Sequence, residues 1–290
     1  MTALTDLGRE IGEIAERIGP SVVGIGNRWR GGSGVVIAAD RVLTNAHNLH
    51  GETVSITFPD GRTVDGRPLG VDTDGDLAIV EAETGAAAAL ELASETPRIG
   101  SPVVALGNPG GHGARVTLGF VSGVNRSFRG PRGRRVAGAV EHTAPLLPGS
   151  SGGPVVDLDG RLLGINTNRI GHGFYQAIGA DDALRERIAA LGRGEAPQRR
   201  RLGVGLAPAH VARRLRRAVG LPERDGLLVR EVEDGSPAAG AGIAEGDLIV
   251  AAGGTAIATA DDLFDALAGS GPLELTLVRG VEELTVTVSE

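Results

Sequence analysis

A serine flanked by glycines is the strongest chemical signal in this sequence. Residues 148–154 read Pro-Gly-Ser-Ser-Gly-Gly-Pro. Glycines around a serine allow successive backbone N–H groups to turn toward one point, as the binding of an oxyanion requires. A serine becomes a nucleophile only when a base lies within hydrogen-bond reach and a third group orients that base. The segment therefore predicts nucleophilic catalysis if a histidine and an acid accompany it, and an ordinary turn if they do not.

A histidine and a run of acids stand upstream of this serine. His47 ends the apolar segment 43–47, and the acidic residues within 72–76 lead into a second apolar segment. The order along the chain is therefore histidine, acid, serine. Residues 149–153 also match the G-x-S-x-G pattern of α/β-hydrolases, but in those enzymes the serine comes first and the histidine last. The order favours a different fold.

The composition is that of a globular protein built on β structure. Of the 290 residues, 41% are hydrophobic and 22% are charged, which excludes a wholly disordered chain. The 47 glycines indicate many turns, and an aromatic content of 2% means that aliphatic side chains must fill the cores. The sequence has no cysteine, which excludes disulfides, a cysteine nucleophile and thiolate metal sites. His47 and His50 lack a third ligand motif nearby, so we predict no metal and no cofactor.

The charge pattern predicts neither a nucleic-acid partner nor a membrane span. The formal net charge is −7, so the arginine-rich runs at 126–135, 199–201 and 213–217 are interpreted as solvated loops or helix faces. No stretch approaches the run of about 18 apolar residues that a membrane helix needs. The opening residues lack the cationic start and apolar core of a signal peptide. We expect a cytoplasmic location for the chain as written, and a periplasmic or extracellular one only if a leader was removed.

Apolar spacing divides the chain into a short segment and two domains. Residues 4–18 carry isoleucine and leucine at helical spacing, which predicts an amphipathic helix. Short apolar runs separated by turn residues follow, as is typical of an antiparallel sandwich or barrel, and a helix at 181–191 closes them. The predicted divisions are an N-terminal segment (1–20), a first domain (21–191), a linker rich in Pro, Gly and charge (192–201) and a second domain (202–290).

Two helices are predicted in the second domain. One covers residues 211–219. The other covers residues 260–267, where Thr259 and Asp262 resemble a capping box with Asp in place of Glu.

Three segments together resemble the motifs of the HtrA family, trypsin-like serine proteases with a C-terminal PDZ domain. They are Thr44-Asn45-Ala46-His47, Asp76-Leu77-Ala78 and Gly149-Ser150-Ser151-Gly152-Gly153-Pro154. Ser236-Pro237-Ala238 and Gly246-Asp247-Leu248-Ile249 are similar to the PDZ domains of that family. The resemblance covers residues 1–290. It implies a mainly β fold with two six-stranded antiparallel β-barrels of the chymotrypsin/trypsin-like type, followed by a PDZ domain.

The resemblance implies a role for each residue of the predicted site. Ser151 would attack the scissile carbonyl, His47 would accept the serine proton, and Asp76 would orient His47. The backbone N–H groups of Gly149 and Ser151 would form the oxyanion hole. Ser150 is the alternative candidate for the nucleophile, but the family pattern favours Ser151, the serine that is followed by Gly-Gly-Pro.

The other two acids of the run, Asp72 and Asp74, are interpreted as solvated turn residues.

The same resemblance predicts which residues select the substrate. The segment before the nucleophile and the strand after Asn166 would line the pocket for the residue before the scissile bond. No acid stands six residues before Ser151, where enzymes that cut after Lys or Arg place one, so a small aliphatic preference is expected. His142 and His172 leave an acidic preference as the alternative. The predicted pocket residues are Pro145, Leu146, Leu147, Ala177 and Ile178.

In the second domain, Arg201-Leu202-Gly203-Val204 stands where a carboxylate-binding loop would be. Successive N–H groups there could bind the terminal carboxylate of a peptide that adds a strand to the sheet. The predicted peptide-binding residues are Leu202, Gly203, Val204, Leu263 and Leu267, and the alternative is that the apolar ones are core residues.

The resulting prediction is a serine endopeptidase that acts on unfolded or damaged proteins and is regulated by peptide C-termini. The alternative is a catalytically silent peptide-binding or chaperone-like module. The resemblance also implies a homotrimer. Family members usually trimerise through aromatic N-terminal segments, but residues 1–28 contain no aromatic side chain, so this expectation rests on the resemblance alone.

Overall fold

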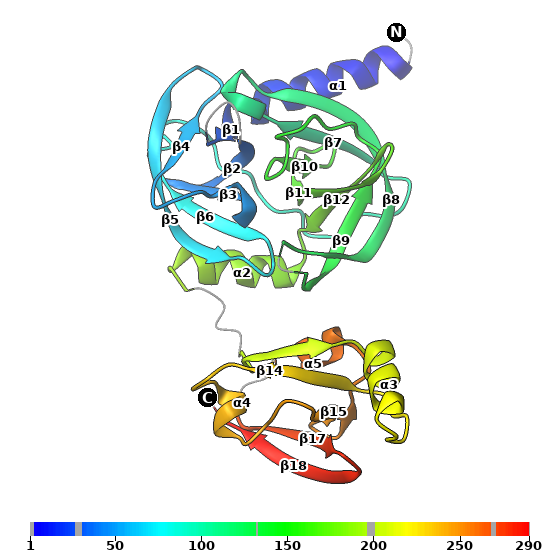
Figure 1. Ribbon diagram of the computed structural model, residues 1–290. Coiled ribbons are helices and arrows are strands. Elements are labelled where there is room, and N and C mark those ends of the chain that lie inside the picture. The colour runs from blue at the N-terminus through cyan, green and yellow to red at the C-terminus, as the bar shows by residue number, and fades with distance from the viewer. Residues whose placement is uncertain (1–2, 27–30, 132, 196–200, 268–270, 290) are drawn as a thin grey trace. The chain divides into compact units, whose positions relative to one another are not determined.

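The structure is a computed structural model that describes residues 3–26, 31–131, 133–195, 201–267 and 271–289. The chain divides into two compact units, Met1–Pro197 and Gln198–Glu290 (Figure 1). This division falls inside the predicted linker at 192–201, of which residues 196–200 lie outside the described part.

The described strands of the first unit form two closed antiparallel barrels, so the predicted fold class is confirmed. The first barrel closes in the order β1 (Val22–Ile25), β2 (Gly32–Ala38), β3 (Arg41–Thr44), β6 (Leu77–Glu81), β5 (Thr63–Asp72) and β4 (Val54–Thr57). The second closes in the order β10 (Pro154–Val156), β11 (Leu162–Gly171), β12 (Phe174–Gly179), β9 (Arg135–His142), β8 (Arg115–Arg129) and β7 (Pro102–Gly107).

The burial of the strands explains the short apolar runs in the sequence. All four residues of β1 and all three of β10 are buried, so these strands read as continuous apolar runs. β4 instead alternates buried and partly exposed residues, as expected when one face of a strand points outward. Leu43 of the first barrel and Leu106 and Ile165 of the second share one hydrophobic cluster. The barrels are therefore joined by a common core.

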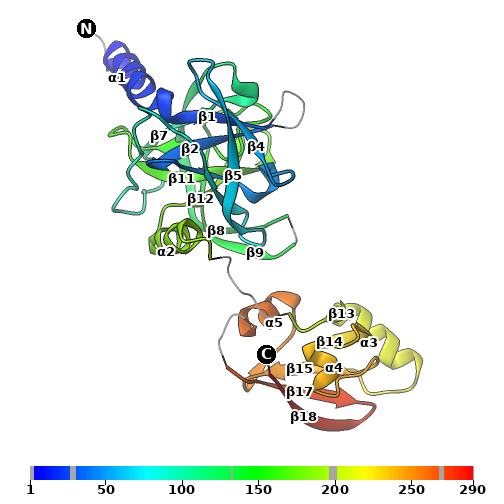
Figure 2. The same ribbon diagram turned by 90° about the vertical axis from the view of Figure 1, so that its left-hand side faces the viewer.

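Two longer helices pack against this core from opposite ends of the first unit (Figure 2). α1 (Ala3–Ile18) buries Ile14 and Ile18 but leaves Leu4 80% exposed, so only its C-terminal half is packed. α2 (Asp182–Gly192) begins at Asp181, whose side chain accepts a hydrogen bond from the N–H of Leu184. The short 3-10 helices are η1 (Gly19–Ser21), η2 (Ala46–Asn48) and η3 (Pro109–Gly111).

The second unit is a sheet flanked by helices. Its strand order is β13 (Val204–Ala207), β14 (Leu227–Val232), β15 (Leu248–Ala252), β17 (Leu273–Arg279) and β18 (Glu282–Val288), and β16 (Thr255–Ala256) pairs with β15. The helices are α3 (Ala209–Ala218), α4 (Pro237–Gly240) and α5 (Ala260–Ala266). The predicted capping box at Thr259 and Asp262 is confirmed at the start of α5. Within the described ranges, no helix is long and apolar enough to cross a membrane.

Candidate active site

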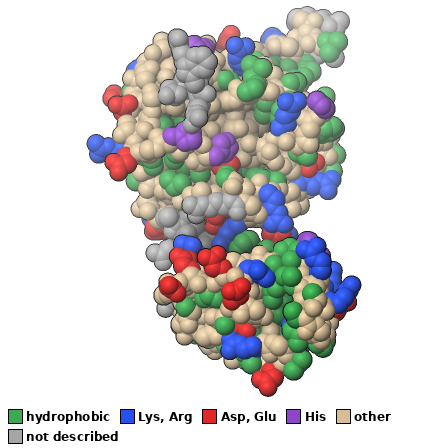
Figure 3. Space-filling view, viewed as in Figure 1, with side chains coloured by type: hydrophobic (Ala, Val, Ile, Leu, Met, Phe, Trp, Pro, Cys, Tyr) green, Lys and Arg blue, Asp and Glu red, His purple; other side chains and the backbone are tan. Residues whose placement is uncertain are grey.

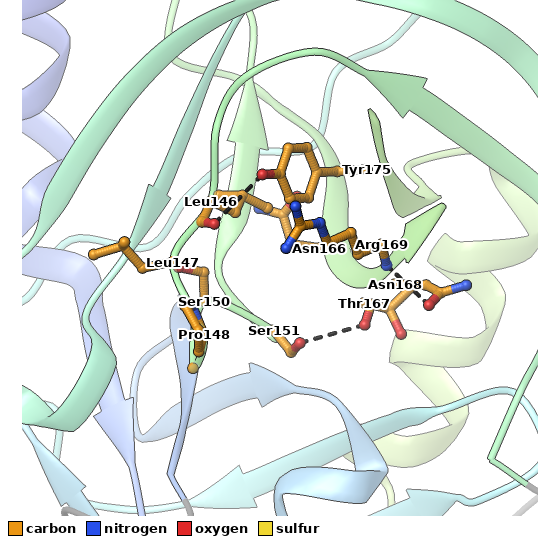
Figure 4. Close-up of a pocket in the computed structure, with 11 residues that line it drawn as sticks. Leu146, Leu147, Pro148, Ser150, Ser151, Asn166, Thr167, Asn168, Arg169 and Tyr175 are labelled. Carbon is orange, nitrogen blue, oxygen red and sulfur yellow. Dashed lines mark hydrogen bonds between the residues drawn. The ribbon is translucent and has the colours of Figure 1, made fainter. Parts of the chain in front are cut away.

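The predicted site residues lie where the two barrels contribute short connections. His47 lies in η2, directly after β3, and Asp76 directly precedes β6. Ser151 lies in the turn that leads into β10 of the second barrel, and it lines a cavity of about 150 Å³ (Figure 4).

Asp76 holds the imidazole of His47. The Nδ1 atom of His47 lies 2.9 Å from both carboxylate oxygens of Asp76, and the His47 backbone N–H donates to Asp76 Oδ1 at 3.2 Å. Thr167 Oγ1 donates to Asp76 Oδ2 at 2.5 Å. Since the carboxylate is 1% exposed and accepts all these bonds, it favours the tautomer of His47 that carries its proton on Nδ1. Nε2 is then free to accept a proton.

The hydroxyl of Ser151 is oriented by a backbone carbonyl. Ser151 Oγ donates to the carbonyl oxygen of Thr167 at 3.3 Å (Figure 4). Thr167 therefore contacts both Asp76, through its hydroxyl, and Ser151, through its carbonyl. To act as a nucleophile, Ser151 has to turn its hydroxyl away from this carbonyl and donate to His47 Nε2, a step compatible with the looser geometry of unoccupied active sites.

The turn that carries Ser151 depends on two glycines in left-handed backbone conformation. Gly149 has φ of 86° and Gly152 has φ of 89°. Ser33 ties this turn to the first barrel, because its N–H donates to Ser151 O at 2.7 Å and its hydroxyl donates to Gly149 O at 2.8 Å. Asn48 Nδ2 also donates to Ser151 O, at 2.9 Å. The first barrel thus fixes the position of a turn that belongs to the second barrel.

The backbone N–H groups of Gly149 and Ser151 donate to no acceptor among the residues that the structure describes. The neighbouring N–H groups of Ser150, Gly152 and Gly153 all have carbonyl partners. Two unbonded donors beside a serine hydroxyl are what an oxyanion hole requires. Gly149 and Ser151 are the residues assigned to the oxyanion hole from the sequence, and that role stays a prediction.

The cavity beside Ser151 differs in part from the predicted pocket. Leu146 and Leu147 line it as predicted, together with Pro148, Gly149, Ser150, Ser151, Asn166, Thr167, Asn168, Arg169 and Tyr175. Pro145 instead lines a neighbouring cavity of about 340 Å³. Ala177 and Ile178 were wrongly assigned to the pocket: they are 0% and 2% exposed and pack in the hydrophobic clusters of the first unit.

The interpretation of Asp72 and Asp74 as solvated turn residues was also wrong. Asp72 is 2% exposed and lies 2.9 Å from Arg187 Nη2. Asp74 lies 3.0 Å from Arg134 Nε, and both of these side chains are largely buried. Their partners come from distant parts of the chain, which local sequence patterns do not indicate.

The buried side chain of His142 lies behind this pocket. Its Nε2 atom lies 2.8 Å from Asn166 Oδ1, and its ring stacks on Tyr175 at 5.8 Å between centroids. Asn166 Nδ2 donates to the carbonyls of Gly153 and Pro154, so Asn166 Oδ1 faces His142 and Nε2 must donate to it. Burial lowers the pKa of His142 from its ordinary value of 6.5.

This histidine should make stability depend on pH. Below pH 6.5 the unfolded chain binds a proton at His142, whereas the folded chain resists protonation. The free energy of unfolding therefore decreases as the pH is lowered. The slope is at most about 1.4 kcal/mol per pH unit. It fades as the pH rises above 6.5 and levels off again as the pH drops below the lowered pKa of the folded state. In His142→Gln, whose amide can still donate to Asn166, urea titrations should show a shallower pH dependence in this range. Equal pH dependence in both proteins would contradict the prediction.

In the second unit, the predicted peptide-binding residues lie partly in the core. Leu202, Leu263 and Leu267 are at most 5% exposed and belong to its hydrophobic cluster, as the alternative interpretation had it. Gly203 has φ of 75° and its carbonyl accepts the N–H of Glu233. Val204 begins β13, which stands at the edge of the described sheet. Apolar side chains form a band on the face of this unit shown in Figure 3.

Two family models match the two units. The model described as a trypsin-like peptidase domain matches residues 32–165, and the model described as a PDZ domain matches residues 228–279. The first match contains His47, Asp76 and Ser151, and the second contains most of the sheet of the second unit.

Curated relatives match both units together. The chain is 37% identical over 278 residues to "Putative serine protease HhoA" of Synechocystis sp., covering 89% of this chain and 69% of that protein. It is 34% identical over 265 residues to "Putative serine protease HhoB" of the same organism, covering 86% and 63%. It is 34% identical over 279 residues to "Serine protease HTRA2, mitochondrial" of Drosophila virilis, covering 89% and 66%. The chain thus spans about two thirds of the length of these relatives.

Solved structures show the same fold. "HtrA-type protease AlgW with decapeptide" superposes with a TM-score of 0.76 at 24% identity, covering 96% of this chain and 97% of that one. The serine endoprotease from Yersinia pestis superposes with a TM-score of 0.73 at 25% identity, covering 96% of each chain. With two matching domains in the same order and relatives above 30% identity, the chain belongs to the HtrA family of serine proteases, which combine a trypsin-like peptidase domain with a PDZ domain.

Proposed function

We propose that this chain is a serine endopeptidase that hydrolyses peptide bonds of unfolded or damaged proteins through His47, Asp76 and Ser151. One observation carries the proposal. The buried carboxylate of Asp76 holds His47 Nδ1 at 2.9 Å, while the turn around Ser151 has two N–H groups with no acceptor among the described residues. A base with a fixed tautomer, a serine and an oxyanion site are the parts that acyl transfer from a peptide requires.

Each part has a defined task in the proposed reaction. Ser151 Oγ attacks the scissile carbonyl carbon as its proton passes to His47 Nε2, and Asp76 stabilises the imidazolium that forms. The N–H groups of Gly149 and Ser151 bind the resulting oxyanion. His47 then gives its proton to the leaving amine, which leaves an acyl-enzyme. Water, deprotonated by His47, hydrolyses the acyl-enzyme and restores the serine.

The pocket supports a small side chain before the scissile bond. A cavity of about 150 Å³ is lined by Leu146, Leu147, Arg169 and Tyr175 among others, and none of its described lining residues is a carboxylate. A long cationic side chain would therefore find neither the space nor the countercharge that it needs. We propose small aliphatic residues as the preferred ones at this position.

We further propose that the second unit binds peptide C-termini and regulates hydrolysis. β13 stands at the edge of its sheet, and Gly203 precedes it in the left-handed conformation that lets a loop turn its N–H groups toward a carboxylate. A peptide could add a strand at such an edge. AlgW, a structural neighbour, is described with a decapeptide and with a tripeptide, which supports peptide binding in this fold.

The test compares one protein substrate in two states. We expect the native chain to degrade a reduced, carboxymethylated protein that cannot fold, and to leave its disulfide-bonded folded form largely intact. Ser151→Ala should degrade neither. A peptide with a free apolar C-terminus should change the rate, whereas its C-terminal amide should not. Binding of the unfolded protein without cleavage would favour the catalytically silent module, which the assembled site does not favour.

A further inference from the structure

The residue just before Asp76 is enclosed by a buried ion pair. Arg187 Nη2 donates to the carbonyl oxygen of Gly75 at 2.8 Å and lies 2.9 Å from Asp72 Oδ2. Asp72 Oδ1 in turn accepts the N–H of Gly75 at 2.9 Å. The pair therefore binds both the N–H and the carbonyl of Gly75, and that carbonyl belongs to the peptide group that joins Gly75 to Asp76.

A side chain at Gly75 would displace this ion pair. A Cβ atom there would lie 2.1 Å from Arg187 Nη2 and 2.2 Å from Asp72 Oδ2. The Asp72 side chain is 3% exposed and that of Arg187 is 22% exposed, so water competes little for these bonds. Hydrogen bonds of this kind, with a charged donor or acceptor, are stronger than neutral ones.

Asp76 needs such support because its backbone is unusual. Its φ is 55°, which places a residue other than glycine in the left-handed region. This conformation persists only where the surroundings impose it. On the far side, Asn45 Nδ2 donates to the carbonyl oxygen of Asp76 at 2.9 Å. The backbone of Asp76 is thus held by Asn45 on one side and by Arg187 with Asp72 on the other.

Arg187 itself is carried by a firmly packed helix. It lies in α2, which buries Leu184 and Leu191 in the core of the first unit. Gly70 of β5 lies so close to this helix that a Cβ there would be 2.4 Å from the carbonyl oxygen of Leu191. α2 cannot shift toward the barrel without a clash, so the backbone position from which Arg187 extends is well defined.

From these contacts we infer that Arg187 is a positioning residue for the catalytic acid, acting through Asp72 and Gly75 on the orientation of Asp76. The inference rests on the proposed function of His47, Asp76 and Ser151. It also makes α2, the last described helix before the linker, part of the support of the active site.

The main test combines substitutions at Arg187 and Asp76. Arg187→Met keeps an unbranched apolar stem of the side chain but removes the guanidinium with its charge and donors. We expect it to lower kcat by about 10- to 100-fold with little change in KM, because a small displacement of a catalytic group costs rate more than binding. In the Asp76→Asn background, Arg187→Met should have almost no further effect on kcat, since the group it positions is already lost. Equal fold-losses in both backgrounds would show a general structural role and overturn the inference.

Arg185→Met is the matched control. Arg185 lies in the same helix but bonds to Ala93 O and approaches Asp182, away from the loop at 72–76. It should leave kcat close to that of the native chain. Arg187→Lys, which keeps the charge but not the fork of donors, should recover part of the loss.

A second readout does not need turnover. The proton between His47 Nδ1 and Asp76 should give a low-field proton NMR resonance, which His47→Ala would identify by its loss. In the Ser151→Ala background, Arg187→Met should shift or broaden this resonance and Arg185→Met should not. An unchanged resonance in Arg187→Met would overturn the inference. The native chain could fail to hydrolyse peptides while the resonance still responds to Arg187→Met. That outcome would count against the proposed function alone.

Discussion

Replacing Asp76 with asparagine is expected to lower kcat by about 10⁴-fold while the chain remains folded. The amide of asparagine would present a donor where His47 Nδ1–H now donates to the carboxylate at 2.9 Å. The imidazole would then favour the tautomer with its proton on Nε2, and it could no longer accept the proton of Ser151. Thr167 Oγ1, which donates to the same carboxylate, would hold the new side chain in place.

The measurement is kcat and KM on one peptide for the native chain and for Asp76→Asn, with circular dichroism to verify the fold. Asp65→Asn is the control, because Asp65 is an exposed aspartate in the same barrel. It should leave kcat unchanged. A loss of less than about 10-fold in Asp76→Asn would show that Asp76 does not orient the base.

A single methyl group at Gly152 is expected to reduce kcat by at least about 10²-fold, an effect comparable to the loss of an oxyanion donor. The Cβ of Gly152→Ala would lie 2.0 Å from the carbonyl oxygen of Ser33, which is backbone and cannot rotate away. The turn would have to move, and Ser151 with its N–H group would move with it. The bond from Gly152 N–H to Asn166 O at 2.7 Å would be strained by the same shift.

Gly51→Ala is an unusually close control for this substitution. Gly51 and Gly152 share a φ of 89°, so the left-handed backbone should destabilise an alanine by about 1–2 kcal/mol at either position. A Cβ at Gly51 would meet nothing within 4 Å. The melting temperature of Gly152→Ala should therefore equal that of Gly51→Ala or lie below it in thermal melts. Activity assays should show a large loss of kcat only in Gly152→Ala. Equal kcat in the two variants would contradict the proposed role of the turn.

The architecture could be predicted from the sequence where apolar patterns are local. The buried runs of the two barrels, the helix at α1 and the capping box before α5 all follow from neighbouring residues. β5 has no such apolar pattern, because Gly66, Pro68 and Gly70 within it are typical of turns. Both glycines are needed for packing: a Cβ at Gly66 would lie 2.6 Å from Val80, and one at Gly70 would meet the backbone of Leu191.

The site could be predicted only in its central residues. The motifs around His47, Asp76 and Ser151 indicated which residues could act, and the structure brings His47 and Asp76 into contact. The pocket wall was misassigned because β11 extends as far as Gly171, so that Thr167, Asn168 and Arg169 occupy the place given to Ala177 and Ile178. The bonds from Ser33 and Arg187 join residues far apart in the chain, and no local pattern indicates them.

The central claim is that Ser151 is an activated nucleophile, and covalent labelling tests it most directly. The native chain, Ser151→Ala and Ser150→Ala would be treated with a serine-directed fluorophosphonate, with and without an unfolded protein, and their intact masses measured. We expect one phosphonyl adduct on the native chain and on Ser150→Ala, and none on Ser151→Ala. An unlabelled native chain under both conditions, or labelling that persists in Ser151→Ala, would contradict the account.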